Sequence, residues 1–555
     1  MGKPIKNIVI VGGGTAGWLT AAYLNHRLQW AYGHPEGVSI TLIEAPDVAT
    51  IGVGEATVPT MSRTLRHLEI SEREFIARTE ATFKLGIDFR DWNVDESGAF
   101  TRFFHGFEGG VQVRGRNPGA ALLAYGADAA VLDYESSFTG IIGHSEERAA
   151  RHKGPKLFES APFTGPQAYA YHLDAGKFAT FLAEVAVARG VTHVRDKVLG
   201  ATHDERGNIA ELVMADGTRR PVELVIDCTG FQGLLINRAM EEPFISYADY
   251  LLNDRALPIQ IAHAPEPDLY PATVSTARPA GWSWRIPLQS RIGTGYVFSS
   301  AFASDEQALD EALGYLDGET LLTEPRTLAM RVGHCRRSWV GNCVAIGLSG
   351  GFIEPLESTA IQLIETACRR LLQFFPSSDF EPELAQKFNV AMTGQYEEIR
   401  DFLGLHFSLS NRSDTPYWLA VQHDAKRSDR LNESIAVWRR SLPDAYDDRA
   451  SNVFSYWSIC TLLFGKGFYT RPLESGTDML PRETWDRFLR EWGAIKKASV
   501  EMLPDHGELI RHIVAGARPG SSAARTPHVP RITIGGDALS DRLTVMRPPT
   551  AFVAP

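Results

Sequence analysis

The sequence is poor in the features that mark disulfide-rich, zinc-binding and membrane-spanning proteins. Only five of its 555 residues are cysteines, and none of them forms a Cys-x-x-Cys pair. The odd number and the spacing argue against a disulfide framework or a zinc site, so we expect buried, reduced thiols. No run of 18 apolar residues predicts a transmembrane helix. The N-terminus lacks a separate apolar segment with a cleavage site, and we therefore expect a cytoplasmic protein.

Basic charge is also scarce. Asp and Glu number 67 against 56 for Lys and Arg, which gives a formal net charge of −11. A protein that neutralises nucleic-acid phosphates needs a basic surface, so this balance argues against a nucleic-acid partner. What is present is ordinary globular material, 44% hydrophobic and 22% charged. The length is sufficient for two or more domains, or for one large domain with a substantial core.

A glycine-rich turn near the N-terminus is the first positive signal. The β-branched run 8–11 leads directly into Gly12-Gly13-Gly14-Thr15-Ala16-Gly17, and apolar residues follow at helical spacing over 18–24. A second predicted strand, 38–43, ends at Glu44. This order of strand, turn, helix, strand and acidic residue is typical of an α/β dinucleotide-binding fold with a parallel sheet.

Each residue type in this turn has a physical role. Gly12 permits the tight turn, Gly14 lets the backbone approach a pyrophosphate, and Gly17 lets the helix pack closely on the strand. The N–H groups and the positive dipole end of the helix face the phosphates. Glu44 can accept hydrogen bonds from ribose hydroxyls, and its charge disfavours a ligand with a 2′-phosphate.

Later segments repeat this pattern. Asp174 is expected to cap a helix that ends at Gly190 and leads into a strand over 191–198. Strands over 210–214 and 222–226 are expected to flank a turn at Asp216-Gly217. The pattern resumes at 345–347, before a helix predicted over 359–375. We therefore expect a Rossmann-type module that is assembled from separated segments.

The expected organisation has three parts. A nucleotide-binding module covers 1–385, with inserted β-containing substrate segments at about 60–170 and 235–335. A mostly helical part over 386–516, with helices near 396–406 and 431–440, is expected to line a substrate pocket. Residues 517–555 are rich in Pro, Ser, Arg and Gly and predict an irregular tail.

The dinucleotide is predicted to be FAD rather than NAD. Asp227-Cys228-Thr229-Gly230 ends a predicted strand, as in two-dinucleotide-type flavoproteins. Gly341-Asn342-Cys343-Val344-Ala345-Ile346-Gly347 stands where such flavoproteins bring a strand end to the flavin. The resemblance at this point is to a superfamily.

Three further segments narrow the class. Gly281-Trp282-Ser283-Trp284-Arg285-Ile286-Pro287 contains a Trp-x-Trp-x-Ile-Pro signature, and Gly52-Val53-Gly54-Glu55-Ala56-Thr57-Val58-Pro59 looks like a flavin strap. Phe352-Ile353-Glu354-Pro355-Leu356-Glu357-Ser358-Thr359 is the third. Over about residues 5–480 the chain resembles the flavin-dependent halogenases of the tryptophan halogenase family. Taken alone, Trp282 and Trp284 are better explained by a strand with both rings on one face, and it is the other two motifs that favour the family.

This resemblance implies a reaction. FADH2 comes from a separate flavin reductase, and chloride or bromide is oxidised at the flavin to hypohalous acid. The acid passes through an internal tunnel to an electron-rich aromatic substrate such as indole or tryptophan. The matching catalytic pair is Lys84 and Glu357. An apolar setting makes a lysine amine reactive, although a lysine can also snorkel to solvent. Glu357 can orient the halogenating species, accept the ring proton, or form a salt bridge with Lys84.

Matching by position assigns the remaining sites. The halide falls at the backbone of Thr359 and of Ala360, where relatives commonly have glycine. His105 and Phe107 match a pair of rings that sandwich indole, and the family completes this wall in the helical part, where Tyr456, Trp457, Phe468 and Tyr469 lie. Besides the glycines of the turn, flavin contacts fall at Thr15, Ala16, Glu44, Val198, Leu348 and Ile361.

Two other functions stay open. A flavoprotein aromatic monooxygenase shares the nucleotide fold, but such enzymes usually place Asp after the glycine that corresponds to Gly347, and here Leu348 follows. The tryptophan motif also disfavours it. A flavin-binding sensor or scaffold is disfavoured because both Lys84 and Glu357 are present. A homodimer, common among relatives, is compatible with the sequence.

Overall fold

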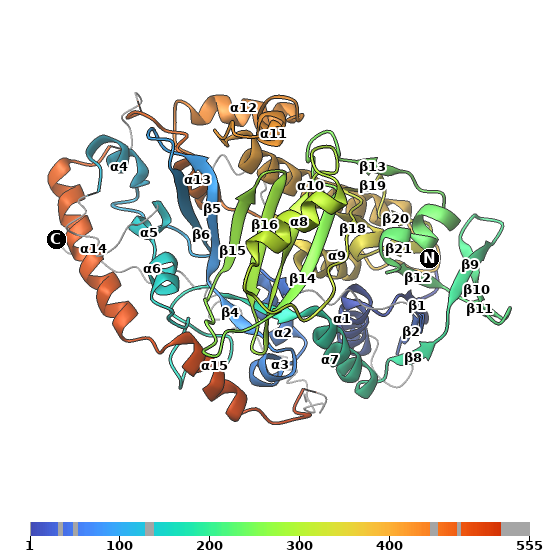
Figure 1. Cartoon of the computed structure of the whole chain (residues 1–555). Helices are drawn as coiled ribbons and strands as arrows, with labels where there is room; N and C mark the ends of the chain where they lie inside the picture. The colour runs from blue at the N-terminus through green and yellow to red at the C-terminus, as the bar shows by residue number, and fades with distance from the viewer. Residues whose placement is uncertain are drawn as a thin grey trace, which may run out of the picture. The chain divides into compact units, whose positions relative to one another are not determined.

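The computed structural model describes residues 2–31, 37–47, 54–127, 138–444, 453–473 and 479–522 (Figure 1). Gly52 and Val53 of the expected flavin strap lie outside these ranges, as does most of the expected tail. Every element below belongs to one unit, Met1–Ala523. The division of the chain into three parts stays a prediction.

A six-stranded sheet carries the glycine-rich turn. Its order is β20-β21-β12-β1-β2-β8, and all neighbours pair in parallel except β20 and β21. The strands are β1 (Asn7–Val11), β2 (Ser39–Glu44), β8 (Thr192–Arg195), β12 (Leu224–Asp227), β20 (Trp339–Val340) and β21 (Cys343–Ala345). Strands from three distant stretches of the chain thus meet in one sheet. The predicted assembly of the nucleotide fold from separated segments is confirmed.

Three helices accompany this sheet. They are α1 (Thr15–Ala31), α7 (Ala175–Ala188) and α9 (Ala360–Gln373), and α1 and α7 lie side by side (Figure 1). The carboxylate of Asp174 accepts a hydrogen bond of 2.9 Å from Lys177 N, which is the predicted N-cap of α7. The apolar face of α7 is buried, as its helical spacing indicated.

Two strand predictions in the middle of the chain need correction, one in its length and the other in its partners. The expected strand 191–198 divides into β8 and β9 (Val198–His203). The Asp216-Gly217 turn joins β10 (Ile209–Met214) to β11 (Arg219–Pro221), which together with β9 form a small antiparallel sheet. The strand expected over 222–226 is β12, which is buried along its whole length and pairs with β1 and β21 instead. An apolar run of this kind fits the middle of a parallel sheet better than a hairpin.

The inserted segments build the second large layer, a seven-stranded sheet of order β18-β14-β17-β16-β15-β5-β6. Its strands are β5 (Gly86–Val94), β6 (Phe100–Gly106), β14 (Arg255–Ala262), β15 (Thr273–Arg278), β16 (Gly281–Pro287), β17 (Arg291–Phe298) and β18 (Leu328–Ala329). Helix α8 (Asp305–Tyr315) covers one face, where Ala308 and Ala312 pack against strand residues (Figure 1).

Two three-stranded sheets complete the β structure. One has the order β3-β7-β4 and joins β3 (Gly54–Ala56) and β4 (Thr82–Lys84) to β7 (Ala170–Asp174). The other joins β13 (Phe244–Ser246), β19 (Gly333–Cys335) and β22 (Gly351–Phe352). In the first sheet β7 lies between β3, which belongs to the strap, and β4, which ends at Lys84.

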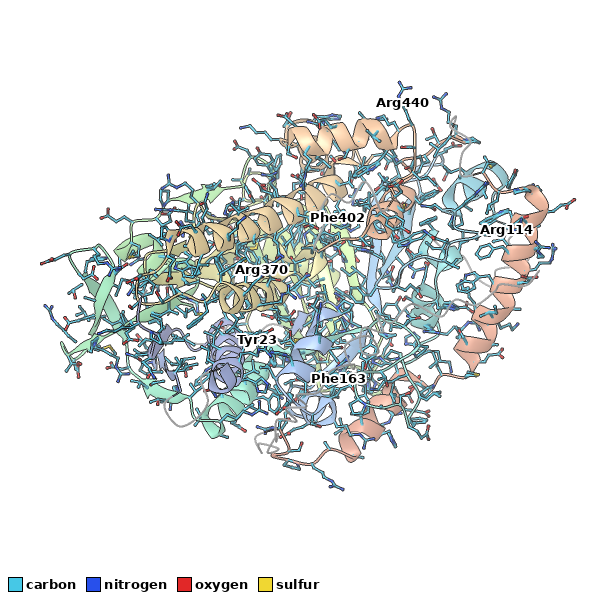
Figure 2. All side chains as sticks on the ribbon, turned by 180° about the vertical axis from the view of Figure 1, so that it is seen from behind. Tyr23, Arg114, Phe163, Arg370, Phe402 and Arg440 are labelled. Atoms are coloured by element: carbon cyan, nitrogen blue, oxygen red, sulfur yellow. The ribbon has the colours of Figure 1, made fainter. Side chains whose placement is uncertain are left out.

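The described residues after 381 are mostly helical, as predicted. Helix α10 (Pro382–Ser408) is 27 residues long, so it begins well before the expected 396. Figure 2 shows it from behind, where Phe402 marks the part of α10 nearest its C-terminal end. The other helices are α2 (Thr60–His67), α3 (Glu72–Arg78), α4 (Gly119–Tyr125), α5 (Phe138–Ile142), α6 (Ser145–Ala150), α11 (Pro416–His423), α12 (Asp429–Trp438), α13 (Tyr456–Gly465), α14 (Arg482–Glu501) and α15 (His506–Ala515).

The last features concern the cysteines and the apolar character of the helices. All five cysteines are free thiols, and four of them are buried. Within the described ranges, no helix combines the length and the apolar character that a membrane crossing requires.

Candidate active site

The glycine-rich turn is packed tightly on two sides and open on the third. Gly12 has φ +121°, and a side chain there would collide with the carbonyl of Cys228, while one at Gly17 would collide with Gly12. A Cβ built at Gly14 has no atom within 4 Å. The backbone at Gly14 is therefore free to approach a ligand, and the turn fits the pyrophosphate of a dinucleotide.

The other predicted nucleotide residues come from several elements. The Glu44 carboxylate lies against Gly13 and is 2.8 Å from Nε2 of His193, a partner that the sequence did not indicate. Gly347, at φ +79°, packs on Ala16 at the start of α1, which brings the following Leu348 to the same place. Ile361 lies in the first turn of α9 and Val198 begins β9, and both side chains are buried.

Lys84 ends β4 and is fully buried. Its Nζ donates hydrogen bonds to Ser358 Oγ at 2.8 Å and to the carbonyl of Thr57 at 3.3 Å, and it lies 5.1 Å from the centre of the Phe107 ring. Burial lowers the pKa of Lys84 to about 7, because the charge of Glu357 offsets the loss of water only in part. Near neutral pH the amine is therefore divided between its neutral and its protonated form.

Glu357 lies in the short turn η4 (Pro355–Glu357) and is also buried. Nδ1 of His105 is 3.0 and 3.1 Å from its two oxygens, and Nε2 of His406 is 2.7 Å from Oε1. Burial alone would raise the pKa of Glu357, but His105, through its charge and hydrogen bond, and His406 lower it to about 2. Glu357 is therefore a carboxylate at any pH at which the enzyme would work.

Lys84 and Glu357 meet through a neighbour and not as an ion pair. Among the described residues, the partners of the lysine are Ser358 and Thr57, whereas those of the glutamate are the two histidines. Ser358 has φ +60°, a left-handed conformation that costs a non-glycine residue of order 1–3 kcal/mol. Ser358 directly follows Glu357, and its own hydroxyl accepts the hydrogen bond from Lys84. One short turn therefore carries the carboxylate and positions the amine.

The two predicted halide positions begin the next helix. Thr359 is the N-cap of α9 but its side chain makes no capping hydrogen bond, and Ala360 is the first helical residue. The first N–H groups of a helix have no partner within the helix. These N–H groups carry a partial positive charge and suit an anion, and here Thr359 and Ala360 stand two and three residues after Glu357.

Aromatic rings gather beside His105. The Phe402 ring of α10 lies 5.9 Å from that of His105 and stacks on Phe454 at 3.8 Å and 12°. Of the four aromatic residues expected in the C-terminal wall, Trp457 packs against Gly110, just beyond Phe107. Aromatic side chains from β6, α10 and α13 thus lie in one part of the structure, beside His105.

Sequence reasoning missed His406, Phe402 and Phe454. A signal for the first two was present, because residues 402 and 406 are four apart on a helix and share one face. The position of His406 next to Glu357 has no local signal, since His406 follows the glutamate by 49 residues.

The tryptophan motif lies in β16. Trp282 and Trp284 share one face of the strand, with ring centres 6.2 Å apart and planes at 59°. Both are buried. The indole N–H of Trp282 donates to Oε1 of Glu354 at 2.9 Å, three residues before Glu357. The motif therefore contacts the turn that carries the candidate catalytic carboxylate.

A dinucleotide turn on the same chain as a buried lysine and a buried carboxylate indicates a dinucleotide-dependent enzyme. The tryptophan halogenase family model matches residues 7–482. Tryptophan 7-halogenase RebH of Lentzea aerocolonigenes is 37% identical over 467 residues, which are 80% of this chain and 83% of RebH. Tryptophan 6-halogenase SttH of Streptomyces toxytricini is 38% identical over 482 residues, 83% of this chain and 89% of SttH.

A solved structure shows the same fold. BrvH, a flavin-dependent halogenase from Brevundimonas sp. BAL3, superposes with a TM-score of 0.80 at 34% identity and covers 92% of this chain and 99% of its own. The chain belongs to the tryptophan halogenase family. It is an enzyme of the flavin-dependent halogenase class, and the aromatic hydroxylase alternative is not supported.

Proposed function

We propose that this enzyme uses FADH2, O2 and chloride or bromide to halogenate an electron-rich aromatic ring such as that of indole or tryptophan. The single observation that carries the proposal is the buried turn at 357–358. It presents a carboxylate on one residue and holds the Lys84 amine with the next. The names of the relatives support a tryptophan-like substrate.

The residues of the glycine-rich turn fit FAD, because Gly14 faces open space while its neighbours are tightly packed. The chemistry that bound FADH2 supplies is the oxidation of halide by O2 to hypohalous acid. A separate flavin reductase would deliver the reduced cofactor. The proposed FAD contacts are Gly12, Gly14, Thr15, Ala16, Gly17, Glu44, Val198, Leu348 and Ile361.

Lys84 would hold the halogenating species at the substrate. Its Nζ is fixed by Ser358 and Thr57, and an amine with a pKa of about 7 can act as a hydrogen-bond donor or, when neutral, as a nucleophile that forms a haloamine. Burial around the amine would keep the halogenating species from escaping into solvent, where it would react without selectivity. The backbone N–H groups of Thr359 and Ala360 would hold the halide before its oxidation.

Glu357 would orient the electrophile or accept the proton that the ring carbon loses. It is anionic, so an oxygen can accept that proton, and His105 and His406 fix the carboxylate plane. His105 and Phe107 would hold the flat substrate by ring contacts. The helical part, through Phe402 and Phe454, would complete the wall.

The test is a reconstituted assay with a flavin reductase, NADH, FAD, bromide or chloride, and a panel of small indoles, read by mass spectrometry. We expect a mass increase of one halogen, and we expect no product when halide is omitted. A hydroxylated product that forms without halide would overturn the proposal.

A further inference from the structure

The indole N–H of Trp282 donates to the carboxylate of a buried glutamate. Glu354 is fully buried, and its carboxylate receives two N–H donors, Trp282 Nε1 on Oε1 at 2.9 Å and Asn253 Nδ2 on Oε2 at 3.0 Å. Burial raises the pKa of Glu354 to about 7, and the two donors oppose that rise. The carboxylate is thus held at a fixed place by groups from two different segments.

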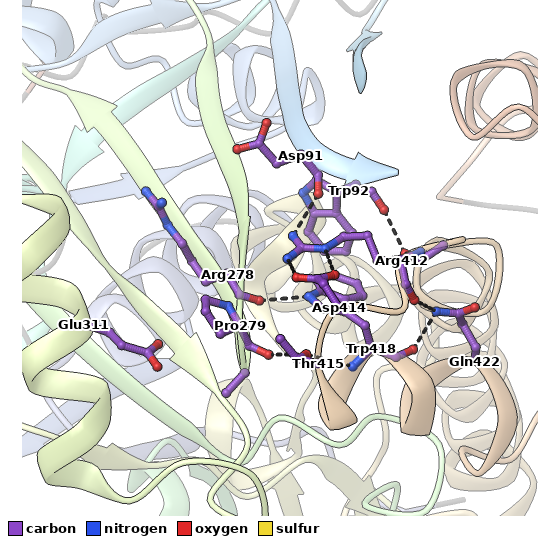
Figure 3. Close-up of polar contacts among 12 residues, drawn as sticks. Asp91, Trp92, Arg278, Pro279, Glu311, Arg412, Asp414, Thr415, Trp418 and Gln422 are labelled. Carbon is purple, nitrogen blue, oxygen red and sulfur yellow. Dashed lines mark hydrogen bonds and ion pairs between the residues drawn. The ribbon is translucent and has the colours of Figure 1, made fainter. Parts of the chain in front are cut away.

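Helix α11 supports the segments that carry these two donors. Tyr417 OH donates to Asn253 Oδ1 at 3.0 Å, so α11 fixes the second donor. The same helix and its N-cap Thr415 anchor the turn that leads from β15 into β16, because Trp418 Nε1 donates to the carbonyl of Arg278 at 2.9 Å and Thr415 Oγ1 to that of Pro279 at 2.7 Å (Figure 3). The positions of Trp282 and Asn253 are therefore supported by α11 through contacts that do not involve Glu354.

The chain from Glu354 to Ser358 has little freedom. Pro355 fixes its own φ and begins η4, and Ser358 stands in the left-handed conformation with its hydroxyl on Lys84. Movement of the Glu354 side chain would move Glu357 and Ser358 with it. Displacement of reacting groups by about 1 Å can cost about 100-fold in rate.

We propose that Trp282 is a positioning residue, whose indole N–H, through Glu354, sets the place of Glu357 and Ser358. This gives the first tryptophan of the motif a role in geometry that is separate from lining the space between flavin and substrate. A ring that only lines that space needs its shape but not its N–H. The inference rests on the proposed function, since it is read out through halogenation.

The decisive variant replaces Trp282 by 3-benzothienylalanine, in which sulfur takes the place of the N–H and the ring shape is kept. We expect kcat for halogenation to fall by about 10- to 100-fold. KM for the aromatic substrate and the affinity for FAD should each stay within about twofold of the unmodified enzyme. An unchanged kcat would overturn the inference.

Trp339 supplies the matched control. It is 1% exposed, against 2% for Trp282, and its indole N–H donates to a backbone carbonyl, that of Gly341, at 2.8 Å. It stands in β20, in the nucleotide sheet. The same replacement at Trp339 should leave kcat unchanged even where it lowers the melting temperature. Equal losses of kcat at both positions would show a general structural effect and reject the inference.

A double-mutant cycle tests whether the effect runs through Glu354. In the Glu354→Leu background, the replacement at Trp282 should have no further effect on kcat, because its acceptor is gone. Glu354→Gln keeps an acceptor oxygen for the indole N–H and should retain more activity than Glu354→Leu. Additive losses in the cycle would contradict the inference. Failure of the proposed function is distinguishable, because the unmodified enzyme would then form no halogenated product.

Discussion

His506 connects the C-terminal helix to the strand that carries Lys84. It is fully buried, its Nε2 accepts from Phe83 N at 3.0 Å, and its Nδ1 donates to the carbonyl of Leu269 at 2.5 Å. An amide can only donate and a carbonyl can only accept, so the ring must be neutral with its proton on Nδ1. His506→Phe would leave both backbone groups buried and unpaired.

The cost of this substitution can be worked out. Each unpaired buried group costs about 1–3 kcal/mol, so we expect the free energy of unfolding to fall by about 2–6 kcal/mol at neutral pH. Burial lowers the pKa of His506 from 6.5 to about 4. The unfolded chain therefore takes up this proton first, and the wild-type protein loses stability as the pH falls from 6.5 towards 4.

The phenylalanine variant has no such proton to bind, so the difference in stability between the two proteins should narrow on acidification. The shift of about 1.5 pH units between 6.5 and 5 corresponds to about 2 kcal/mol. Urea unfolding of both proteins at pH 7 and pH 5 measures it. A difference that is constant or that grows towards pH 5 would refute the assigned neutral state.

Two further predictions concern the site itself. His406→Leu removes the 2.7 Å hydrogen-bond donor to Glu357 and should lower kcat by at least about tenfold. His406→Gln keeps an N–H donor and should retain more activity. Steady-state kinetics at neutral pH measure both variants, and equal rates for the two would contradict the prediction. Gly14→Asp should weaken FAD binding by at least about tenfold, because the new side chain adds bulk and negative charge at the pyrophosphate. The protein should stay folded, since no protein atom lies within 4 Å of the new Cβ. Equilibrium dialysis with FAD measures the affinity and circular dichroism the folding, and an unchanged affinity would contradict the prediction.

The parts of the fold that sequence reasoning predicted well are those with local causes. The β1, Gly12–Gly17 and α1 unit follows from residue periodicity and from steric needs of neighbouring residues. The N-cap by Asp174 is equally local. The Asp216-Gly217 turn favours a hairpin for the strand expected over 222–226, but the partners of this strand lie more than a hundred residues away on either side.

The candidate site divides in the same way. Lys84 and Glu357 were found by resemblance, and the structure brings both to one buried turn. Their partners could not be predicted, because Ser358 rather than the glutamate holds the lysine and His406 comes from a helix later in the chain. The hydrogen bond between Trp282 and Glu354 likewise joins two signatures whose contact no local pattern encodes.

The most direct test of the central claim is the yield of halogenated indole per FADH2 oxidised by wild type and by Lys84→Ala, with excess methionine present to remove free hypohalous acid. The account predicts that the variant forms no halogenated product while its affinity for FAD is unchanged, because Lys84 contacts Ser358 and Thr57 and not the nucleotide turn. Equal yields from the two proteins would contradict the role of Lys84 as the group that delivers the halogen.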